Sequence, residues 1–347
     1  MEYKLALIGF GNVGQGLAEI LSDKAALLRE KFDSDIRIVA ICDLYKGSIA
    51  DADGFDPQAL LDHVTEHDDL KDFPAPDKGW DASETIANSG ANVLVELSFT
   101  DLETGEPALG HIIQALESGM NVSTSNKGPA ALHFPKLLDL ARTHGGQIGV
   151  EGTVMSCTPT LALGMNMLAA AGVNRIQGIL NGTTNYILGE MESGANYADA
   201  LKDAQAKGFA EADPSGDVDG HDAAAKVVIL ANLVMGQSMT MSDVSCAGIS
   251  GITSDQIQSA KTDNQRWKLI GTLENVDGEI QGSVKPVKLD ATHPLYGIGG
   301  ATNAITYSTD LLGDITLIGP GAGRLETGYA IIGDILSFSA GLDESLR

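Results

Sequence analysis

Cysteine is scarce in this sequence of 347 residues, and long apolar runs are missing from it. The three cysteines, Cys42, Cys157 and Cys246, are far apart and odd in number. They form neither a disulfide framework nor a Cys-x-x-Cys motif, and each is expected to be a small buried residue. No apolar run reaches the ~18 residues of a membrane span, and the first residues are strand-like rather than a basic-then-apolar leader. These absences predict a cytoplasmic protein in a reducing compartment.

Positive charge is also in short supply. The sequence has 22 Lys and Arg against 47 Asp and Glu, a net charge of −25 and a pI near 4.4. Nucleic acid and anionic membranes are therefore disfavoured as partners. Apolar residues make up 43% of the chain and the mean hydropathy is +0.03, which is typical of a globular protein with ample core. The length exceeds the size at which one core keeps growing, so two domains are expected.

The N-terminus has a glycine fingerprint between a strand and a helix. Residues 4–8 form an apolar run, and a helical pattern extends from Gln15 to about Lys31. The residues between them are Gly9, Phe10, Gly11, Asn12, Val13 and Gly14. In this pattern the first glycine makes the turn, the second lets the main chain approach a pyrophosphate, and the third lets the helix pack on the strand. The helix N-terminus attracts the phosphates, so these six residues are predicted to bind a dinucleotide.

An acid follows the second apolar strand, residues 36–42. Asp43 at that strand end suits the two hydroxyls of an adenosine ribose. Lys46, three residues further on, is able to reach a 2′-phosphate, so both NAD and NADP are open at this point.

Strands and helices alternate through the first 150 residues. Further strands are expected at 93–97, 121–125 and 147–150, with helices at 110–119 and 132–144. This alternation predicts an α/β fold with a doubly wound parallel sheet, which is a Rossmann domain over residues 1–150. Ligands of such sheets lie off the carboxyl ends of the strands, where Ser98, Asn126 and Lys127 fall.

The pattern of expected helices and strands changes after about residue 150. Helices at 160–171, 186–192 and 197–207 mix with strand-like stretches at 175–180, 244–252, 269–273, 279–289 and 304–308. They predict an α+β catalytic and dimerisation domain over residues 151–318, whose exposed sheet face suits subunit pairing. The segment 319–347 begins with a glycine loop and continues as a helix that is expected to return to the Rossmann domain.

Residues 208–226 bring acids and one lysine together in a loop that leads into an apolar helix. Asp222 and Lys226 are four residues apart and share one face of its first turn. A lysine beside acids and against an apolar helix is a candidate proton donor, because desolvation lowers the pKa of an amine. The alternative is an acidic surface loop with an ordinary ion pair.

Several ordered motifs along the chain resemble those of the homoserine dehydrogenases. The resemblance rests on residues 9–14, 124–129, 151–159, 179–188, 208–226 and 319–323, and it runs almost end to end. It implies reversible reduction of L-aspartate 4-semialdehyde to L-homoserine with NAD(P)H, in threonine, methionine and isoleucine synthesis. It is a resemblance to the short, monofunctional form, so no feedback through a C-terminal regulatory domain is expected. A homodimer or homotetramer is implied.

The resemblance also assigns roles to residues. The catalytic residues it implies are Lys226, as proton donor and acceptor, with Lys127 and Asp222. The substrate contacts it implies are Glu211, Asp222, Lys127 and Asp217, with Asp213 in support. The cofactor contacts beyond the glycine turn and Asp43 are Ser98, Lys127, Gly208, Gly321 and Gly323. A monovalent cation, Na⁺ or K⁺, is expected at Glu151, Val154, Ser156 and Thr158, although Gly152 and residues 155–157 depart from the family pattern.

The chemistry of these residues is compatible with those roles. Aldehyde reduction needs a hydride on one side of the carbon and a proton for the alkoxide on the other, and a lysine can supply the proton. Acids suit the substrate's ammonium group, and lysine with main-chain N–H groups suits its carboxylate. Two alternatives remain at this point: another two-domain NAD(P)-dependent dehydrogenase of an amino-acid-like substrate, and a sensor that binds NAD(P) without turnover.

Overall fold

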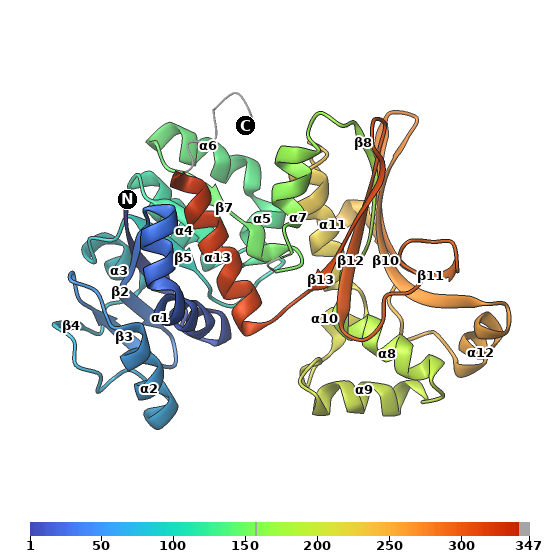
Figure 1. Ribbon diagram of the computed structural model, residues 1–347, viewed down its shortest axis with the longest axis horizontal. Coiled ribbons are helices and arrows are strands. Elements are labelled where there is room, and N and C mark those ends of the chain that lie inside the picture. Colours follow the sequence, from blue (N-terminus) through green and yellow to red (C-terminus); the bar gives the residue numbers. More distant parts are fainter. Residues whose placement is uncertain (157, 340–347) are drawn as a thin grey trace. The chain divides into compact units, whose positions relative to one another are not determined.

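The computed structural model describes residues 1–156 and 158–339. It divides the chain into two compact units (Figure 1). The first unit comprises Met1–Cys157 and Gly323–Arg347, and the second unit comprises Thr158–Ala322. No described helix combines the length and the apolar character needed to cross a membrane.

The first unit is a Rossmann fold built on a seven-stranded sheet. The strand order is β4-β3-β2-β1-β5-β6-β7, and the strands from β2 to β7 in this order are parallel. The strands are β1 Glu2–Ile8, β2 Asp35–Asp43, β3 Gly47–Ala50, β4 Asp77–Lys78, β5 Val93–Glu96, β6 Asn121–Thr124 and β7 Ile148–Gly149. The helices are α1 Asn12–Phe32, α2 Pro57–His67, α3 Ala82–Asn88, α4 Ala108–Glu117, α5 Lys127–Leu132, α6 Phe134–His144 and α13 Arg324–Ser339. The predicted α/β class is confirmed.

Helix α13 returns to the first unit and completes its core, lying beside α1 in Figure 1. Glycines allow the two helices to touch. A Cβ on Gly16 would lie 2.1 Å from the carbonyl oxygen of Arg324, and a Cβ on Gly328 would lie 2.7 Å from the nitrogen of Leu17. Isoleucines of α13, Ile331 and Ile335, are fully buried in the same apolar cluster as the inner residues of β1. The dinucleotide fold therefore includes the C-terminal helix as a structural part.

The second unit is a six-stranded sheet with order β13-β12-β8-β10-β11-β9. Its strands are β8 Val173–Ile179, β9 Val244–Cys246, β10 Gln265–Val276, β11 Glu279–Asp290, β12 Thr302–Thr309 and β13 Gly313–Pro320. Its α-helices are α7 Thr160–Ala162, α8 Gly182–Glu192, α9 Tyr197–Ala206, α10 Ser215–Val218, α11 His221–Leu233 and α12 Ser254–Thr262. Helices α8, α11 and α12 pack on this sheet, which gives the second domain its predicted α+β character.

Helix α11 is buried almost all round, because residues 223–231 are all buried. A helix that is apolar on every side belongs in the interior of a domain. Lys226 is the one charged residue in that buried run.

Several local expectations were wrong. Only Val244–Cys246 of the stretch 244–252 is a strand. Strand β13 and helix α12 were not anticipated. The expected helix 132–144 corresponds to α6, which begins at Phe134, and the short helix α5 before it was not anticipated. Cys246 is exposed rather than buried, Cys42 is partly buried, and Cys157 lies outside the described residues.

A second buried lysine lies in the sheet of the second unit. Lys268 is 2% exposed, and its Nζ donates to Asn185 Oδ1 at 2.8 Å and to the carbonyl of Ile298 at 2.5 Å. Both acceptors are neutral. Burial lowers the pKa of Lys268 from 10.5 to about 8. The charge of Glu192 raises this pKa and the charge of Arg266 lowers it, both to a smaller extent than burial.

This shift predicts a pH dependence of stability. The folded pKa lies below the unfolded pKa, so between about pH 8 and 10.5 the unfolded chain binds more protons at Lys268. The contribution of this group to stability should therefore rise with pH across that window, by a few kcal/mol at most. Urea unfolding of wild type and Lys268→Met from pH 7 to 10.5 measures it.

The unfolding free energy of the wild type minus that of Lys268→Met should rise between about pH 8 and 10.5. Lys288→Met removes a lysine from an exposed position of the neighbouring strand β11 and controls for the general loss of one positive charge. A difference between wild type and Lys268→Met that is constant from pH 7 to 10.5 would contradict the prediction.

Candidate active site

The residues predicted from the sequence fall into both units. The first unit contains Gly9, Phe10, Gly11, Asn12, Val13, Gly14, Asp43, Ser98, Lys127, Glu151, Val154, Ser156 and Gly323. The second unit contains Thr158, Gly208, Glu211, Asp213, Asp217, Asp222, Lys226 and Gly321.

In the second unit, Lys226 is 7% exposed and its Nζ has two hydrogen-bond acceptors. It donates to Asp222 Oδ2 at 2.7 Å and to the main-chain carbonyl of Leu180 at 2.6 Å. Residue 180 directly follows strand β8, whereas Asp222 is on the first turn of α11. The predicted Asp222–Lys226 pair is thus formed, and it is buried instead of being an ordinary surface ion pair.

Asn181 joins the acids of this cluster. Its side-chain nitrogen donates to Asp222 Oδ2 at 2.9 Å and to Asp217 Oδ1 at 2.7 Å. Its side-chain oxygen caps α8 by accepting from the nitrogen of Thr184. One amide therefore fixes two carboxylates and the start of a helix.

Asp217 has a perturbed carboxyl group. Burial raises its pKa above the usual range, the hydrogen bond from Asn181 lowers it, and the nearby Asp222 raises it again. Two carboxylates that share one amide beside a lysine amine form a group of titratable side chains whose charges depend on one another. Such groups are found most often at functional sites.

The loop that precedes these acids is exposed. Gly208 has φ +73°, a left-handed conformation that ends α9 and turns the chain. Glu211 is exposed, and its main-chain carbonyl accepts from the side chain of Gln205 at 3.0 Å. Asp213 accepts from the nitrogen of Ser215, and hydrogen bonding with Ser215 lowers its pKa. The structure thus brings Asp217, Asp222 and Lys226 together, whereas Glu211 is on the open loop.

In the first unit, the glycine turn has the geometry of a dinucleotide-binding loop. Gly9 has φ +104°, and a Cβ there would lie 2.7 Å from the carbonyl oxygen of Leu97. A Cβ on Gly14 would lie 2.9 Å from the carbonyl oxygen of Gly9. A Cβ on Gly11 would meet no atom within 4 Å, which leaves the main chain open to a pyrophosphate. The three glycines therefore suit their three predicted roles, and the residues present fit a dinucleotide.

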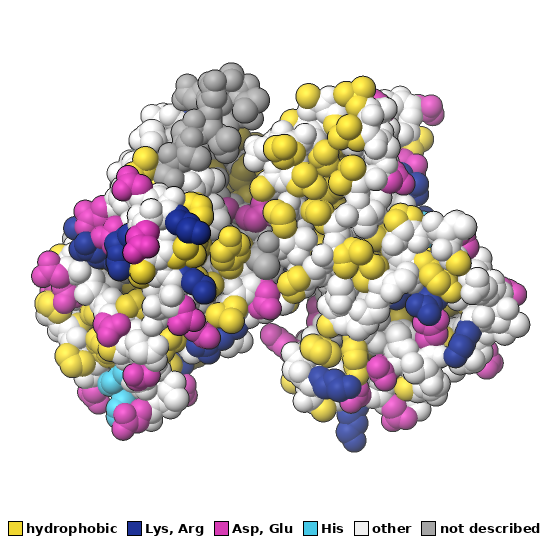
Figure 2. All heavy atoms as spheres, in the orientation of Figure 1, with side chains coloured by type: hydrophobic (Ala, Val, Ile, Leu, Met, Phe, Trp, Pro, Cys, Tyr) yellow, Lys and Arg dark blue, Asp and Glu magenta, His cyan; other side chains and the backbone are white. Residues whose placement is uncertain are grey.

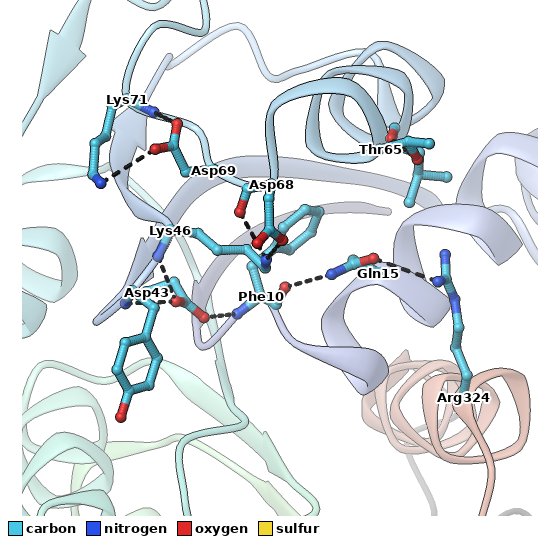
Figure 3. Close-up of polar contacts among 11 residues, drawn as sticks. Phe10, Gln15, Asp43, Lys46, Thr65, Asp68, Asp69, Lys71 and Arg324 are labelled. Carbon is cyan, nitrogen blue, oxygen red and sulfur yellow. Dashed lines mark hydrogen bonds and ion pairs between the residues drawn. The ribbon is translucent and has the colours of Figure 1, made fainter. Parts of the chain in front are cut away.

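Asp43 ends β2 and is connected to this turn (Figure 3). Its Oδ2 accepts from the nitrogen of Phe10 at 2.7 Å. Gln15 donates to the carbonyl of Phe10, and Arg324 of α13 donates to Gln15 and pairs with Glu19 at 3.3 Å. A cation from the C-terminal helix thus lies close to the start of α1, where phosphates would be attracted.

Other predicted residues follow the next two strands of the sheet. Ser98 donates to the fully buried Glu96 at 2.5 Å. Asn126 donates to the carbonyls of Ser98 and Phe99 and caps α5 through the nitrogen of Gly128. Lys127 is the first residue of α5. These residues lie at the carboxyl edge of the sheet, where ligands of doubly wound folds bind.

The candidate cation segment is an irregular turn. Met155 and Ser156 both have left-handed backbones, with φ of 56° and 50°, and Val154 is fully buried. The carbonyl of Thr158 already accepts two hydrogen bonds from Thr160, at 2.5 and 3.0 Å. Within residues 1–156 and 158–339 no group of three or more His, Cys, Asp or Glu could hold a metal ion. A cation here would therefore depend on main-chain carbonyls, and Thr158 fits that role less well than the segment 151–156.

The sequence reasoning missed three polar residues. Asn181 and Arg324 have the contacts given above. Asn303, at the start of β12, is fully buried, and its amide has no hydrogen-bond partner in the described part of the chain. It packs against Gly321, where a Cβ would lie 2.2 Å from the Asn303 side chain. No local pattern marks these residues, because their contacts join distant segments.

Replacing Asn181 should lower the unfolding free energy by more than the removal of a simple helix cap does. Asn181→Ala removes the cap of α8 and the amide that joins Asp217 and Asp222, so we expect a loss of about 2–4 kcal/mol in unfolding free energy. Asn196→Ala removes the exposed cap of α9 and a local hydrogen bond to Asp199, and it should cost about 1 kcal/mol. Chemical denaturation of both variants measures this, and equal losses would contradict the bridging role.

Comparison with known proteins identifies a family for both units. A family model described as the NAD-binding domain of homoserine dehydrogenase matches residues 9–151, and one described as homoserine dehydrogenase matches residues 159–336. The NAD(+)-dependent homoserine dehydrogenase of Pseudomonas canavaninivorans is 43% identical over 96% of both chains. The homoserine dehydrogenase of Methanocaldococcus jannaschii is 37% identical over 96% of this chain and 97% of its own.

A solved structure gives the same result. The hyperthermophilic archaeal homoserine dehydrogenase mutant in complex with NADPH is 30% identical, with a TM-score of 0.83 over 97% of both chains. With a glycine turn shaped for a dinucleotide and a buried lysine among acids, this chain belongs to the homoserine dehydrogenase family of NAD(P)-dependent oxidoreductases that act on a CH–OH group.

Proposed function

We propose that this protein interconverts L-aspartate 4-semialdehyde and L-homoserine, with Lys226 as the proton donor and acceptor, in the synthesis of threonine, methionine and isoleucine. The observation that carries the role of Lys226 is its burial beside Asp222 on an otherwise apolar helix. A charge buried at that cost is most readily explained by a reaction that uses it. A bound nicotinamide dinucleotide supplies the hydride.

The contacts of Lys226 suit proton transfer. Asp222 and the carbonyl of Leu180 hold the amine in one position, 2.7 and 2.6 Å away. In the reductive direction the ammonium group gives a proton to the oxygen that accumulates negative charge, and in the oxidative direction the amine takes the hydroxyl proton. Asn181 and Asp217 keep Asp222 oriented in both directions.

Further residues complete the proposal. Glu211, Asp217 and Asp222 supply negative charge for the ammonium group of the substrate, and Lys127 supplies positive charge for its carboxylate. The names of the relatives mention NAD(+) in one case and NADPH in another, so either dinucleotide is a candidate cofactor. A monovalent cation, if bound by carbonyls of residues 151–156, would neutralise Glu151. A cytoplasmic location, without nucleic acid or membrane partners, agrees with the net charge of −25.

Turnover by variants of Lys226 tests the mechanism. Oxidation of L-homoserine, followed by the absorbance of the reduced cofactor, should fall about 10²- to 10⁴-fold in kcat for Lys226→Ala, with unchanged cofactor affinity. Lys226→Arg keeps a charge beside Asp222 but does not release a proton at neutral pH, so it should be similarly impaired. Lys202→Ala, at an exposed lysine of α9, is the matched control. Near-normal turnover of Lys226→Ala would remove this residue from the mechanism.

The second unit also supports a homodimer or homotetramer. One face of its sheet packs against α8 and α11, whereas part of the other face has polar, half-exposed side chains around a hollow of about 420 Å³. Residues lining the hollow include Arg175, Gln177, Thr272, Glu274, Ser283 and Lys285. In the view of Figure 2, hydrophobic side chains also gather over part of this unit. Among the exposed large hydrophobic residues of the second unit are Met167 and Leu311, which are 77% and 75% exposed. An uncovered sheet face of this kind suits pairing with a second copy.

A bulky charge on that face should lower the oligomeric state. Thr272 is on the central strand β10. Thr272→Arg would place a charge in the proposed interface and should shift the molar mass in light scattering toward the monomer. Thr262→Arg, at an exposed position of α12, is the matched control. An unchanged mass for Thr272→Arg would contradict pairing through this face.

A further inference from the structure

The carboxylate of Asp43 is held rigidly by main-chain groups (Figure 3). Its Oδ2 accepts from the nitrogen of Phe10 at 2.7 Å, and its Oδ1 accepts from the nitrogens of Tyr45 and Lys46, both at 2.9 Å. Main-chain N–H groups orient the carboxylate without cancelling its full negative charge. The end of β2, where a Rossmann fold receives the adenosine ribose, therefore presents a fixed negative group.

Lys46, the cation close to Asp43 in sequence, has its side chain bound to Asp68. Its Nζ donates to the main-chain carbonyl of Asp68 at 2.9 Å and to Asp68 Oδ1 at 3.0 Å. Its side chain is 17% exposed, whereas that of Asp68 is 97% exposed. The main chain adds a further link, because the nitrogen of Leu70 donates to the carbonyl of Lys46 at 2.8 Å.

The backbone of Asp68 favours this contact. Asp68 is the C-cap of α2 in a left-handed conformation, with φ 59°. The last carbonyls of a helix carry partial negative charge and attract a cation. Lys46 therefore serves as the cation of that helix end, with the carboxylate of Asp68 as its counter-ion.

These contacts have an electrostatic consequence for the cofactor. NADP differs from NAD by a phosphate on the 2′ oxygen of the adenosine ribose. That phosphate would meet the fixed charge of Asp43 and would find the adjacent lysine bound to Asp68. The carboxylate of Asp68 is almost fully exposed, so its ion pair with Lys46 is of modest strength. Without that carboxylate Lys46 keeps only its hydrogen bond to the Asp68 carbonyl, which should allow the amine to turn toward a 2′-phosphate.

We propose that Asp68 is a specificity-determining residue, which favours NAD over NADP by holding Lys46 away from the 2′ position of the ribose. The proposal rests on the proposed function only for the identity of the substrate used in the assay. Asp43 repels the phosphate directly, and Asp68 withholds the cation that could compensate.

A pair of neighbouring aspartates tests this. Asp68→Asn removes the charge and keeps a residue that tolerates the left-handed backbone. It should raise kcat/KM for NADP⁺ about 5- to 10-fold, the worth of one exposed charge-assisted contact, while the value for NAD⁺ changes less than about 2-fold. Asp69→Asn is the matched control, because Asp69 pairs with Lys71 rather than Lys46. A gain for NADP⁺ that is equal in Asp69→Asn would overturn the proposal.

A double-mutant cycle identifies the cation. In the Asp68→Asn protein, Lys46→Met should abolish the gain for NADP⁺, whereas in the wild type it should have little effect on NADP⁺. If the gain persists without Lys46, the proposal is wrong. Thermal midpoints of all variants show whether each one remains folded.

Cofactor binding separates this proposal from the proposed function. Dissociation constants of NADP⁺ and NAD⁺, measured by calorimetry without homoserine, do not depend on turnover. Tighter NADP⁺ binding by Asp68→Asn supports the proposal even if homoserine is not oxidised, an outcome that would refute only the proposed function. Unchanged NADP⁺ binding by Asp68→Asn overturns the role of Asp68 even in an active homoserine dehydrogenase.

Discussion

An ammonium group buried on an apolar helix is the constraint on which the catalytic half of the structure depends. Removing the Lys226 charge from water costs several kcal/mol unless its hydrogen bonds are replaced. Asp222 and the carbonyl of Leu180 replace them, and Asn181 holds Asp222 in turn. Strand β8, the start of α8 and the first turn of α11 must therefore all be in position before the charge is stable. The same contacts hold the amine in one place, as the proposed proton transfer requires.

The dinucleotide half obeys a simpler rule, because its functional residues follow directly from strand ends. Gly9 follows β1, Asp43 ends β2, Ser98 follows β5 and Lys127 follows β6. Parallel strands bring their carboxyl ends to one edge of the sheet, so residues far apart in sequence become neighbours through the pairing of the strands that precede them. The proposed determinant of cofactor selection, at the end of β2, therefore belongs to the first unit, and the proposed acid–base residue, on α11, belongs to the second.

Local spacing accounts for what could be predicted from the sequence. The glycine turn, Asp43 and the Asp222–Lys226 pair all depend on residues within a few positions of one another. Asn181 could not be identified in this way, because it contacts acids 36 and 41 residues away. Nor could the partner of Lys46, since Asp68 is 22 residues away and reaches it only because α2 ends there.

Secondary structure was predicted best where apolar patterns were strong and worst at the sheet edges. Strand β13 was missed because it is an edge strand with little burial, and its stability comes from pairing with β12. Helix α5 was missed because Gly128 and Pro129 are typical of a turn, whereas here they lie in the first turn of a short helix that Asn126 caps. Tertiary contacts rather than local propensity decide such elements.

The close packing of α13 on α1 has a consequence for biosynthesis. During translation the first 156 residues leave the ribosome without the isoleucines that fill their apolar core, and these arrive only after the whole second unit has been made. The incomplete dinucleotide-binding domain must therefore avoid aggregation while residues 158–322 emerge from the ribosome. Glycines 16 and 328 then let the late helix dock flush against the early one, so the first domain to be synthesised is the last to be finished.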